Sequence, residues 1–177
     1  AGGWRLGFFA IPDELKELKN SLKILSSESF TSVSAPIQYA AVEAYTGDYS
    51  MYLKKVKKIL LATGMYVYEN LKSNAINVSK PEGGFYLFPE FINAKFSSSS
   101  EMCKEILEKT GVALLPGSDF GLDSKRMIAR LSYTDFDGDN FLKNTSGSNN
   151  LDTDALMKYA PNIVEGVFKL KEWSNSL

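Results

Sequence analysis

Apolar residues recur at three- and four-residue spacing along five stretches of the chain, a pattern that predicts amphipathic helices. The longest stretch spans 49–72, and the other four span 13–26, 37–45, 99–109 and 152–173. The inner stripe of the longest stretch is formed by Val56, Ile59, Leu60, Thr63 and Val67. A solvated helix face, rather than a phosphate-binding patch, is favoured for the lysines that lie mostly outside this stripe, namely Lys54, Lys55, Lys57 and Lys58.

Five shorter apolar runs predict strands. They lie at 4–11, where Pro12 closes the run, and at 76–78, 85–88, 112–115 and 127–133. In the last run, alternation places Ala129, Leu131 and Tyr133 on one face of the strand and Arg130 on the other. Short strands that alternate with helices predict a mixed α/β fold, with a boundary near residue 74. A polar run at 144–150 is predicted to be an insertion or a loop.

Composition narrows the chemistry that the chain can perform. The 177 residues are 44% hydrophobic and carry a formal net charge of -1, which gives no general attraction to nucleic acid or to an anionic membrane. Cys103 is the single cysteine, so no internal disulfide forms, and a reducing, cytoplasmic location is expected. The absence of histidine excludes serine–histidine and cysteine–histidine triads and His-ligated zinc within this chain.

Two patterns resemble known ligand motifs but do not match them. Asp135, Asp137 and Asp139 are spaced like a calcium loop, yet Asn140 and Ser146 occupy the positions that require glycine and glutamate. A turn with Asp137 and Gly138 at its tip is the favoured interpretation, and no metal site is predicted. The glycines at 2, 3 and 7 have the wrong spacing for a dinucleotide fingerprint, although they permit close approach of the backbone to a ligand.

Two arginines lie among apolar neighbours, where an unpaired charge is strongly disfavoured. Arg5 follows Trp4 and precedes an apolar run, so it requires either a protein carboxylate or an anionic ligand. Arg130 lies in the middle of a predicted strand, where it is either a charge on an edge strand or an anion receptor. The pattern alone leaves both alternatives open for each arginine.

Five segments, in order along nearly the whole chain, resemble the class I and II, fold-type I aminotransferases. They are AGGWRLG at 1–7, SAPIQYAA at 34–41, PEGGFYLFP at 81–89, LPGSDFG at 115–121 and ARLSY at 129–133. The resemblance is greatest to the aspartate aminotransferase-like branch. It implies the C-terminal portion of the fold of the pyridoxal 5'-phosphate-dependent transferases. Residues 1–74 would then be the end of the large cofactor domain with a long connecting helix, and 75–177 would be the small domain.

The same resemblance implies roles for the two arginines. Arg5 would bind the phosphate of pyridoxal 5'-phosphate, and Arg130 would grip the α-carboxylate of the substrate. The lysine to which the cofactor is attached is expected about four residues before Ala1, so no catalytic residue is predicted in this chain, which is expected to be inactive alone. Family members act on amino acids and 2-oxo acids and are usually homodimers. In some aspartate-selective members of the family, a second arginine near the segment that corresponds to 29–35 reaches in from the partner subunit and holds the side-chain carboxylate. Residues 29–35 contain no arginine, so the resemblance argues against a dicarboxylic substrate.

Two other hypotheses remain at this stage. A lyase or a decarboxylase would use the same cofactor on the same scaffold. A non-catalytic α/β module for binding or assembly would account for the missing lysine.

Overall fold

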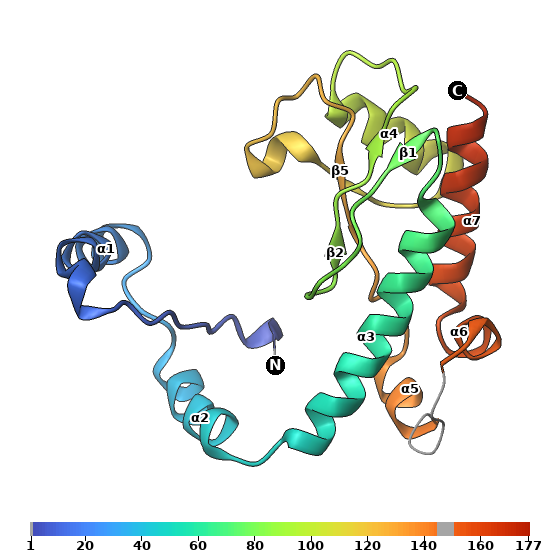
Figure 1. Cartoon of the computed structure of the whole chain (residues 1–177). Coiled ribbons are helices and arrows are strands. Elements are labelled where there is room, and N and C mark those ends of the chain that lie inside the picture. The colour runs from blue at the N-terminus through green and yellow to red at the C-terminus, as the bar shows by residue number, and fades with distance from the viewer. Residues whose placement is uncertain (1, 145–150) are drawn as a thin grey trace. The chain divides into compact units, whose positions relative to one another are not determined.

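The protein is described by a computed structural model, which covers residues 2–144 and 151–177. It divides into two compact units, Ala1–Tyr49 and Ser50–Leu177 (Figure 1). The predicted domain boundary at 74/75 concerns a larger architecture and stays a prediction. Of the polar run predicted at 144–150, residues 145–150 lie outside the described residues.

The first unit contains two α-helices and two short 3-10 helices. The 3-10 helices are η1 (Gly2–Trp4) and η2 (Asp13–Leu15), and the α-helices are α1 (Lys16–Ser29) and α2 (Ala35–Thr46). Both predicted helices are confirmed, and α2 has proline in its first turn, where the missing N–H of proline leaves no hydrogen bond unmade. The predicted strand at 4–11 is wrong, because a strand requires a hydrogen-bonded neighbour and the unit has no other strand among its described residues.

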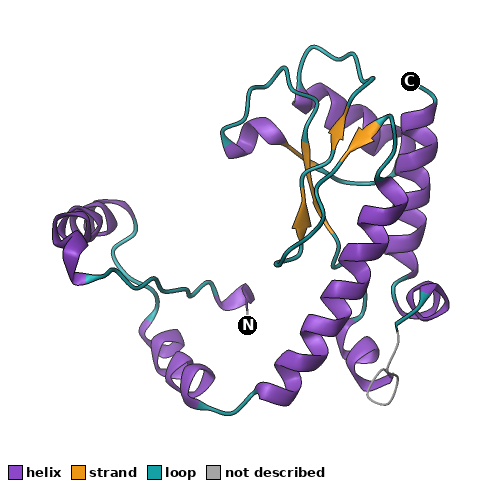
Figure 2. Ribbon diagram, viewed as in Figure 1, coloured by secondary structure: helices purple, strands orange, loops and turns teal. Residues whose placement is uncertain are grey.

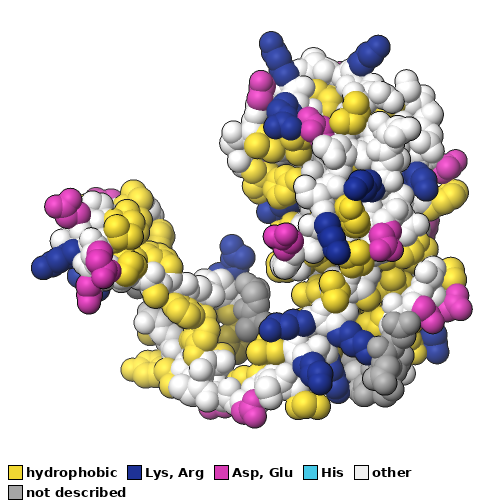
Figure 3. Space-filling view, viewed as in Figure 1, with side chains coloured by type: hydrophobic (Ala, Val, Ile, Leu, Met, Phe, Trp, Pro, Cys, Tyr) yellow, Lys and Arg dark blue, Asp and Glu magenta, His cyan; other side chains and the backbone are white. Residues whose placement is uncertain are grey.

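None of the residues described in the first unit is buried. Figure 3 shows hydrophobic side chains exposed on its surface. The large ones are Trp4, Phe8, Phe9, Leu15, Leu18, Ile24, Leu25, Phe30, Tyr39, Val42, Tyr45 and Tyr49. Because none of them is buried, the described residues of the first unit form no hydrophobic core. A monomeric protein rarely exposes this much apolar surface.

The second unit carries all the strands that the structure describes (Figure 2). Its elements in order are α3 (Ser50–Leu71), β1 (Ile76–Asn77), β2 (Tyr86–Leu87), β3 (Glu90–Phe91), α4 (Ser99–Thr110), β4 (Leu115–Pro116), η3 (Gly117–Phe120), β5 (Ala129–Ser132), α5 (Gly138–Asn144), α6 (Thr153–Tyr159) and α7 (Pro161–Asn175). The predicted mixed α/β class is therefore confirmed.

Two small antiparallel sheets form in this unit. One pairs β1 with β3, and the other has the strand order β2-β5-β4. In the second sheet Tyr86 lies opposite Ser132, and Leu115 lies opposite Arg130. Strand β5 is therefore the central strand, hydrogen-bonded on both sides.

The core of the second unit lies between the sheets and the long helices. Helix α7 packs against both α3 and α4. The predicted inner stripe of α3 is confirmed at Ile59, Thr63 and Val67, which are buried. The largest fully buried side chains include Tyr133, Phe91, Phe141, Leu71, Ile76, Met102, Ile106 and Leu170.

The C-terminal helix predicted at 152–173 is two helices, α6 and α7. They are separated at Ala160, whose backbone has φ −136° and ψ 50°. Pro161 causes the break, because the ring of a proline disfavours helical geometry at the residue that precedes it. The prediction of one continuous helix is therefore wrong, although both helices use the apolar face that was predicted.

Candidate functional site

Arg130 lies in the central strand of the three-stranded sheet. Its neighbours Ala129 and Leu131 point into the core and are 0% and 5% exposed, whereas Arg130 lies on the opposite face and is partly exposed. This confirms the alternation predicted for the strand. Since β5 is paired on both sides, Arg130 is not a charge placed on an edge strand.

Two aromatic rings contact the Arg130 guanidinium. Its central carbon lies 4.2 Å from the ring centre of Tyr86 and 4.4 Å from that of Phe120. Both distances are within the range of cation–π attraction, in which the negative face of the ring stabilises the cation. Among the described residues, no carboxylate forms an ion pair with Arg130.

Arg126 lies four residues before Arg130 and has a different environment. Its Nη2 donates to both carboxylate oxygens of Glu90, at 3.1 and 3.0 Å, and its Nε donates to Glu90 Oε1 at 3.2 Å. These hydrogen bonds raise the pKa of Arg126 above its ordinary value. The guanidinium of Arg126 is therefore bonded to the carboxylate of Glu90, whereas that of Arg130 forms no ion pair with a described carboxylate.

Tyr133 anchors the end of β5 close to Arg130. Its ring is 1% exposed, its hydroxyl donates to the backbone oxygen of Gly84 at 2.9 Å, and burial raises its pKa. Gly84 has φ +70° and lies in the turn just ahead of β2, where only glycine adopts that conformation without strain. The contact ties the turn before Tyr86 to the strand that carries Arg130.

Arg5 lies in the first unit, and its backbone has an unusual conformation. Its φ is 59°, in the left-handed region that non-glycine residues rarely occupy, and its side chain is exposed. A Cβ atom at Gly3 or Gly7 would meet no protein atom within 4 Å. No contact with the described residues therefore requires glycine at these two positions.

The two predicted site arginines thus lie in separate units. Arg5 belongs to the first unit and Arg130 to the second. Sequence reasoning missed Tyr86 and Phe120, although both lie in segments that resemble the family, at 81–89 and 115–121. Tyr86 lies opposite Ser132, two positions along β5 from Arg130, and Phe120 lies in η3 outside the strands, so no local sequence pattern places either ring beside Arg130.

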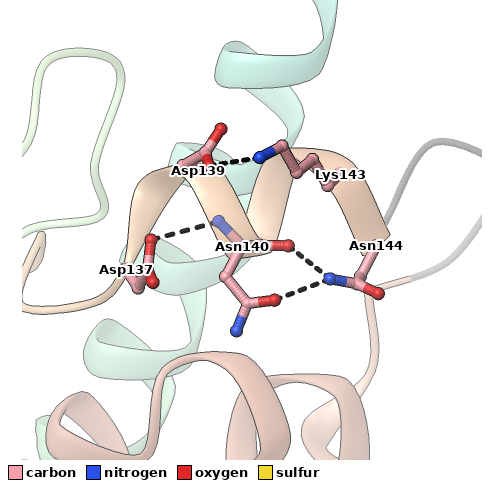
Figure 4. Close-up of polar contacts among 5 residues, drawn as sticks. All are labelled: Asp137, Asp139, Asn140, Lys143 and Asn144. Carbon is pink, nitrogen blue, oxygen red and sulfur yellow. Dashed lines mark hydrogen bonds and ion pairs between the residues drawn. The ribbon is translucent and has the colours of Figure 1, made fainter.

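The acidic run after β5 is used for local contacts (Figure 4). Asp137 Oδ1 accepts a hydrogen bond from the backbone N–H of Asn140 at 3.1 Å, and Asp139 forms an ion pair with Lys143 at 2.6 Å. The predicted turn at Asp137 and Gly138 is the start of helix α5. In the part of the chain that the structure describes, no cluster of acidic or cysteine side chains could hold a metal ion.

A cavity of about 370 Å³ in the second unit lies between α3, the segment after α4, and α7. Its lining includes Val67, Gly111, Leu131 and Gly166 but does not include Arg130. It is therefore separate from the arginine site. None of the described helices combines the length and apolar character needed to cross a bilayer.

Comparison with known proteins gives the chain a family. Residues 1–140 match the model of aminotransferase class I and II. The chain is 34% identical over 135 residues to a probable aspartate/prephenate aminotransferase of Aquifex aeolicus, an alignment that covers 74% of this chain and 33% of that protein. It is 35% identical over 133 residues to a probable N-acetyl-LL-diaminopimelate aminotransferase of Bacillus subtilis, covering 74% and 32%.

Solved structures agree on the fold. An alanine aminotransferase from Pyrococcus furiosus superposes with a TM-score of 0.64 at 20% identity, covering 93% of this chain and 36% of that one. An aspartate aminotransferase from Thermotoga maritima gives a TM-score of 0.60 at 24% identity, covering 98% and 36%. The chain spans about a third of the length of the curated relatives that it matches. Because the family model matches well over half of the chain, the protein belongs to the class I and II aminotransferases.

Proposed function

We propose that the chain is the C-terminal part of a longer pyridoxal 5'-phosphate-dependent aminotransferase that moves an amino group between an amino acid and a 2-oxo acid. Family membership supports the reaction class, and coverage of about a third of each relative supports a longer protein. The observation that carries the proposal is Arg130, a partly exposed arginine in a central strand with no carboxylate partner among the described residues.

Arg130 is proposed to bind the α-carboxylate of the amino acid. A guanidinium donates two parallel hydrogen bonds to a carboxylate, which fixes both its position and its plane. Fixing the carboxylate orients the α-carbon, so that its C–H bond faces the group that removes the proton. Arg130 binds and orients the substrate in this proposal and moves no proton itself.

Arg5 is proposed to bind the phosphate of the cofactor. The residues present fit this group, because an exposed guanidinium suits a phosphate anion and the backbone at Gly3 and Gly7 is open. When bound, pyridoxal 5'-phosphate supplies an electron sink for the carbanion formed at the α-carbon. The lysine that holds the cofactor and transfers the proton is proposed to lie upstream of this chain.

The test uses the full-length protein that carries this chain. Arg130→Ala is expected to lower kcat/KM for the amino acid by about 10- to 100-fold, since a hydrogen bond between charged groups contributes roughly 1.5–3 kcal/mol. Arg130→Lys, which keeps the charge but loses the fork, is expected to recover only part of this loss. An unchanged KM in Arg130→Ala would refute the carboxylate role.

The reaction class has its own test. Full-length protein mixed with an amino acid and 2-oxoglutarate is expected to form glutamate, and borohydride is expected to fix the cofactor to a lysine just upstream of Ala1. Release of ammonia or pyruvate without an acceptor would instead identify a lyase. If no lysine is found within a few residues upstream, the proposal is wrong.

Three wider features belong to the same proposal. Residues 1–74 would complete the large domain and its connecting helix, and 75–177 would form the small domain. The full-length protein would be a homodimer, which light scattering measures directly. A cytoplasmic location is supported by the single buried thiol, Cys103, and is tested by fractionation of cells that express the full-length protein.

A further inference from the structure

We propose that Tyr86 and Phe120 are positioning residues for Arg130, holding its guanidinium between two aromatic rings so that its N–H edge is aligned for a carboxylate. This inference rests on the proposed function of Arg130 as the carboxylate clamp. Many buried arginines are held in position by an acidic side chain, and here the two aromatic rings would hold the guanidinium instead.

The two rings that contact Arg130 come from elements next to different neighbours of β5. Tyr86 belongs to β2 and Phe120 ends η3, which directly follows β4, and these strands flank β5 in the order β2-β5-β4. The ring centres lie 4.2 and 4.4 Å from the guanidinium carbon. A guanidinium has two faces and one hydrogen-bonding edge, so rings that cover the faces leave the edge free to donate.

Each of the two rings is supported by another ring. The Phe85 ring centre lies 4.3 Å from that of Tyr86, with the planes at 48°. The Phe88 ring meets that of Phe120 edge-on, with centres 5.6 Å apart and an angle of 88°. Such pairs stabilise one geometry of the rings over others, which limits the movement available to Arg130.

Backbone contacts fix the same residues to the strand of Arg130. Tyr86 lies opposite Ser132 in the ladder, and the N–H of Tyr133 donates to the oxygen of Phe85 at 3.2 Å. On the other side, Leu115 lies opposite Arg130 itself, just before the turn that carries Phe120. The backbones of Tyr86 and Arg130 therefore belong to one hydrogen-bonded sheet, and the η3 turn that carries Phe120 directly follows a strand of that sheet.

The choice of aromatic partners has a consequence for binding. A carboxylate partner would occupy the N–H donors of the arginine, as Glu90 does for Arg126 at 3.0–3.2 Å. Aromatic faces stabilise the cation without accepting those in-plane hydrogen bonds. Arg130 is thus held in place while its donors and its charge stay available to a substrate carboxylate.

Loss of a ring should therefore weaken carboxylate binding through loss of alignment. A long side chain that must be immobilised during binding loses rotamer freedom, which lowers affinity by roughly two- to tenfold. Tyr86→Leu and Phe120→Leu are each expected to raise KM for the amino acid by about this factor. Tyr86→Phe keeps the ring, so it is expected to recover most of the loss seen in Tyr86→Leu.

The experiment measures kcat and KM of the full-length enzyme, together with the inhibition constant of propionate, a carboxylate that carries no amino group. The variants are Tyr86→Leu, Tyr86→Phe, Phe120→Leu and Arg130→Ala, with Phe168→Leu as the matched control. Phe168 is an aromatic residue of α7 that is 63% exposed and does not contact Arg130. Its replacement is expected to leave KM and the inhibition constant unchanged.

The inference predicts that both leucine variants raise KM and the propionate inhibition constant together, by the same factor. A merely structural effect would lower kcat in proportion to the loss of folded enzyme and leave both constants unmoved, and this result would overturn the inference. If Arg130→Ala raises both constants but neither leucine variant does, the clamp stands and the positioning role is wrong. If Arg130→Ala changes neither constant, the proposed function itself fails.

Discussion

Replacement of Gly64 by alanine should create a steric conflict with Tyr133, which directly follows β5, the strand that carries Arg130. Gly64 lies in the middle of α3, and a Cβ atom there would approach the Tyr133 ring to 3.0 Å at Cζ and 3.1 Å at Cε2. The ring has little room to retreat, since it is 1% exposed and its hydroxyl is bonded to the Gly84 oxygen at 2.9 Å. The added methyl group must therefore displace either α3 or the end of β5.

The magnitude follows from two opposing effects. Alanine is favoured over glycine in a helix interior by about 1 kcal/mol. Forcing one extra carbon into a close-packed site costs typically about 1–3 kcal/mol. Gly166 in α7 isolates the first effect, because a Cβ atom there would lie 3.8 Å from Val112 Cγ2, the nearest atom outside the adjacent helix backbone, which is an ordinary contact. Gly166→Ala should then stabilise the chain by about 1 kcal/mol, whereas Gly64→Ala should be about 1–3 kcal/mol less stable than Gly166→Ala.

Urea unfolding of the two variants and the parent, followed by circular dichroism, measures this difference. A third variant, Tyr133→Leu, removes the atoms that Gly64→Ala would meet. The double variant is therefore expected to lose less stability than the sum of the two single variants. If Gly64→Ala stabilises the chain as much as Gly166→Ala does, Tyr133 is not held rigidly against α3, and the reasoning is refuted.

Three further predictions concern the second unit. Ser98→Ala should destabilise the chain by about 1 kcal/mol in urea, because the Ser98 hydroxyl accepts from the N–H of Glu101 and caps α4. Burial raises the pKa of the Cys103 thiol to about 11, so at pH 8 only roughly a thousandth of it is thiolate. Alkylation by iodoacetamide should therefore be at least ~100-fold slower in the folded than in the urea-unfolded chain, and equal rates would contradict this burial. Glu90→Gln should lower the urea midpoint slightly at low salt and not at high salt, because its partner Arg126 is half exposed.

Local periodicity was enough to predict much of the second unit. The stripe of α3 and the alternation of β5 identify buried faces because the period of each element is a property of the backbone. Ile59 and Val67 are buried as predicted, as are Ala129 and Leu131. The break at Ala160 was visible in the sequence too, since Pro161 restricts the residue before it.

Contacts between distant residues were not predictable in the same way. Glu90 and Arg126 are 36 residues apart, and no local pattern shows that this arginine, rather than Arg130, has a carboxylate partner. The position of Arg130 in a central strand follows from the strand order, which depends on pairing across the whole unit. The contacts of Arg130 with Tyr86 and Phe120 depend on that same order.

The two halves of the proposed site differ in what holds them together. The carboxylate half is built within Ser50–Leu177, where β2, β4 and β5 fix Arg130 and its two rings through their own hydrogen bonds. The phosphate half has no such support, because no described residue of the first unit is buried and its helices contain only 14 and 12 residues. Helices of that length are marginal in water without packing.

Arg5 makes this difference specific. A left-handed conformation at a non-glycine residue costs of order 1–3 kcal/mol and persists only where surrounding structure imposes it. The first unit supplies no buried contact among its described residues that could impose a φ of 59° on Arg5. Under the proposed function, that constraint comes from the rest of the aminotransferase and from the cofactor phosphate. Under the same proposed function, the sheet of the second unit holds Arg130 in place for a carboxylate, whereas the described residues of the first unit do not by themselves fix Arg5 for a phosphate.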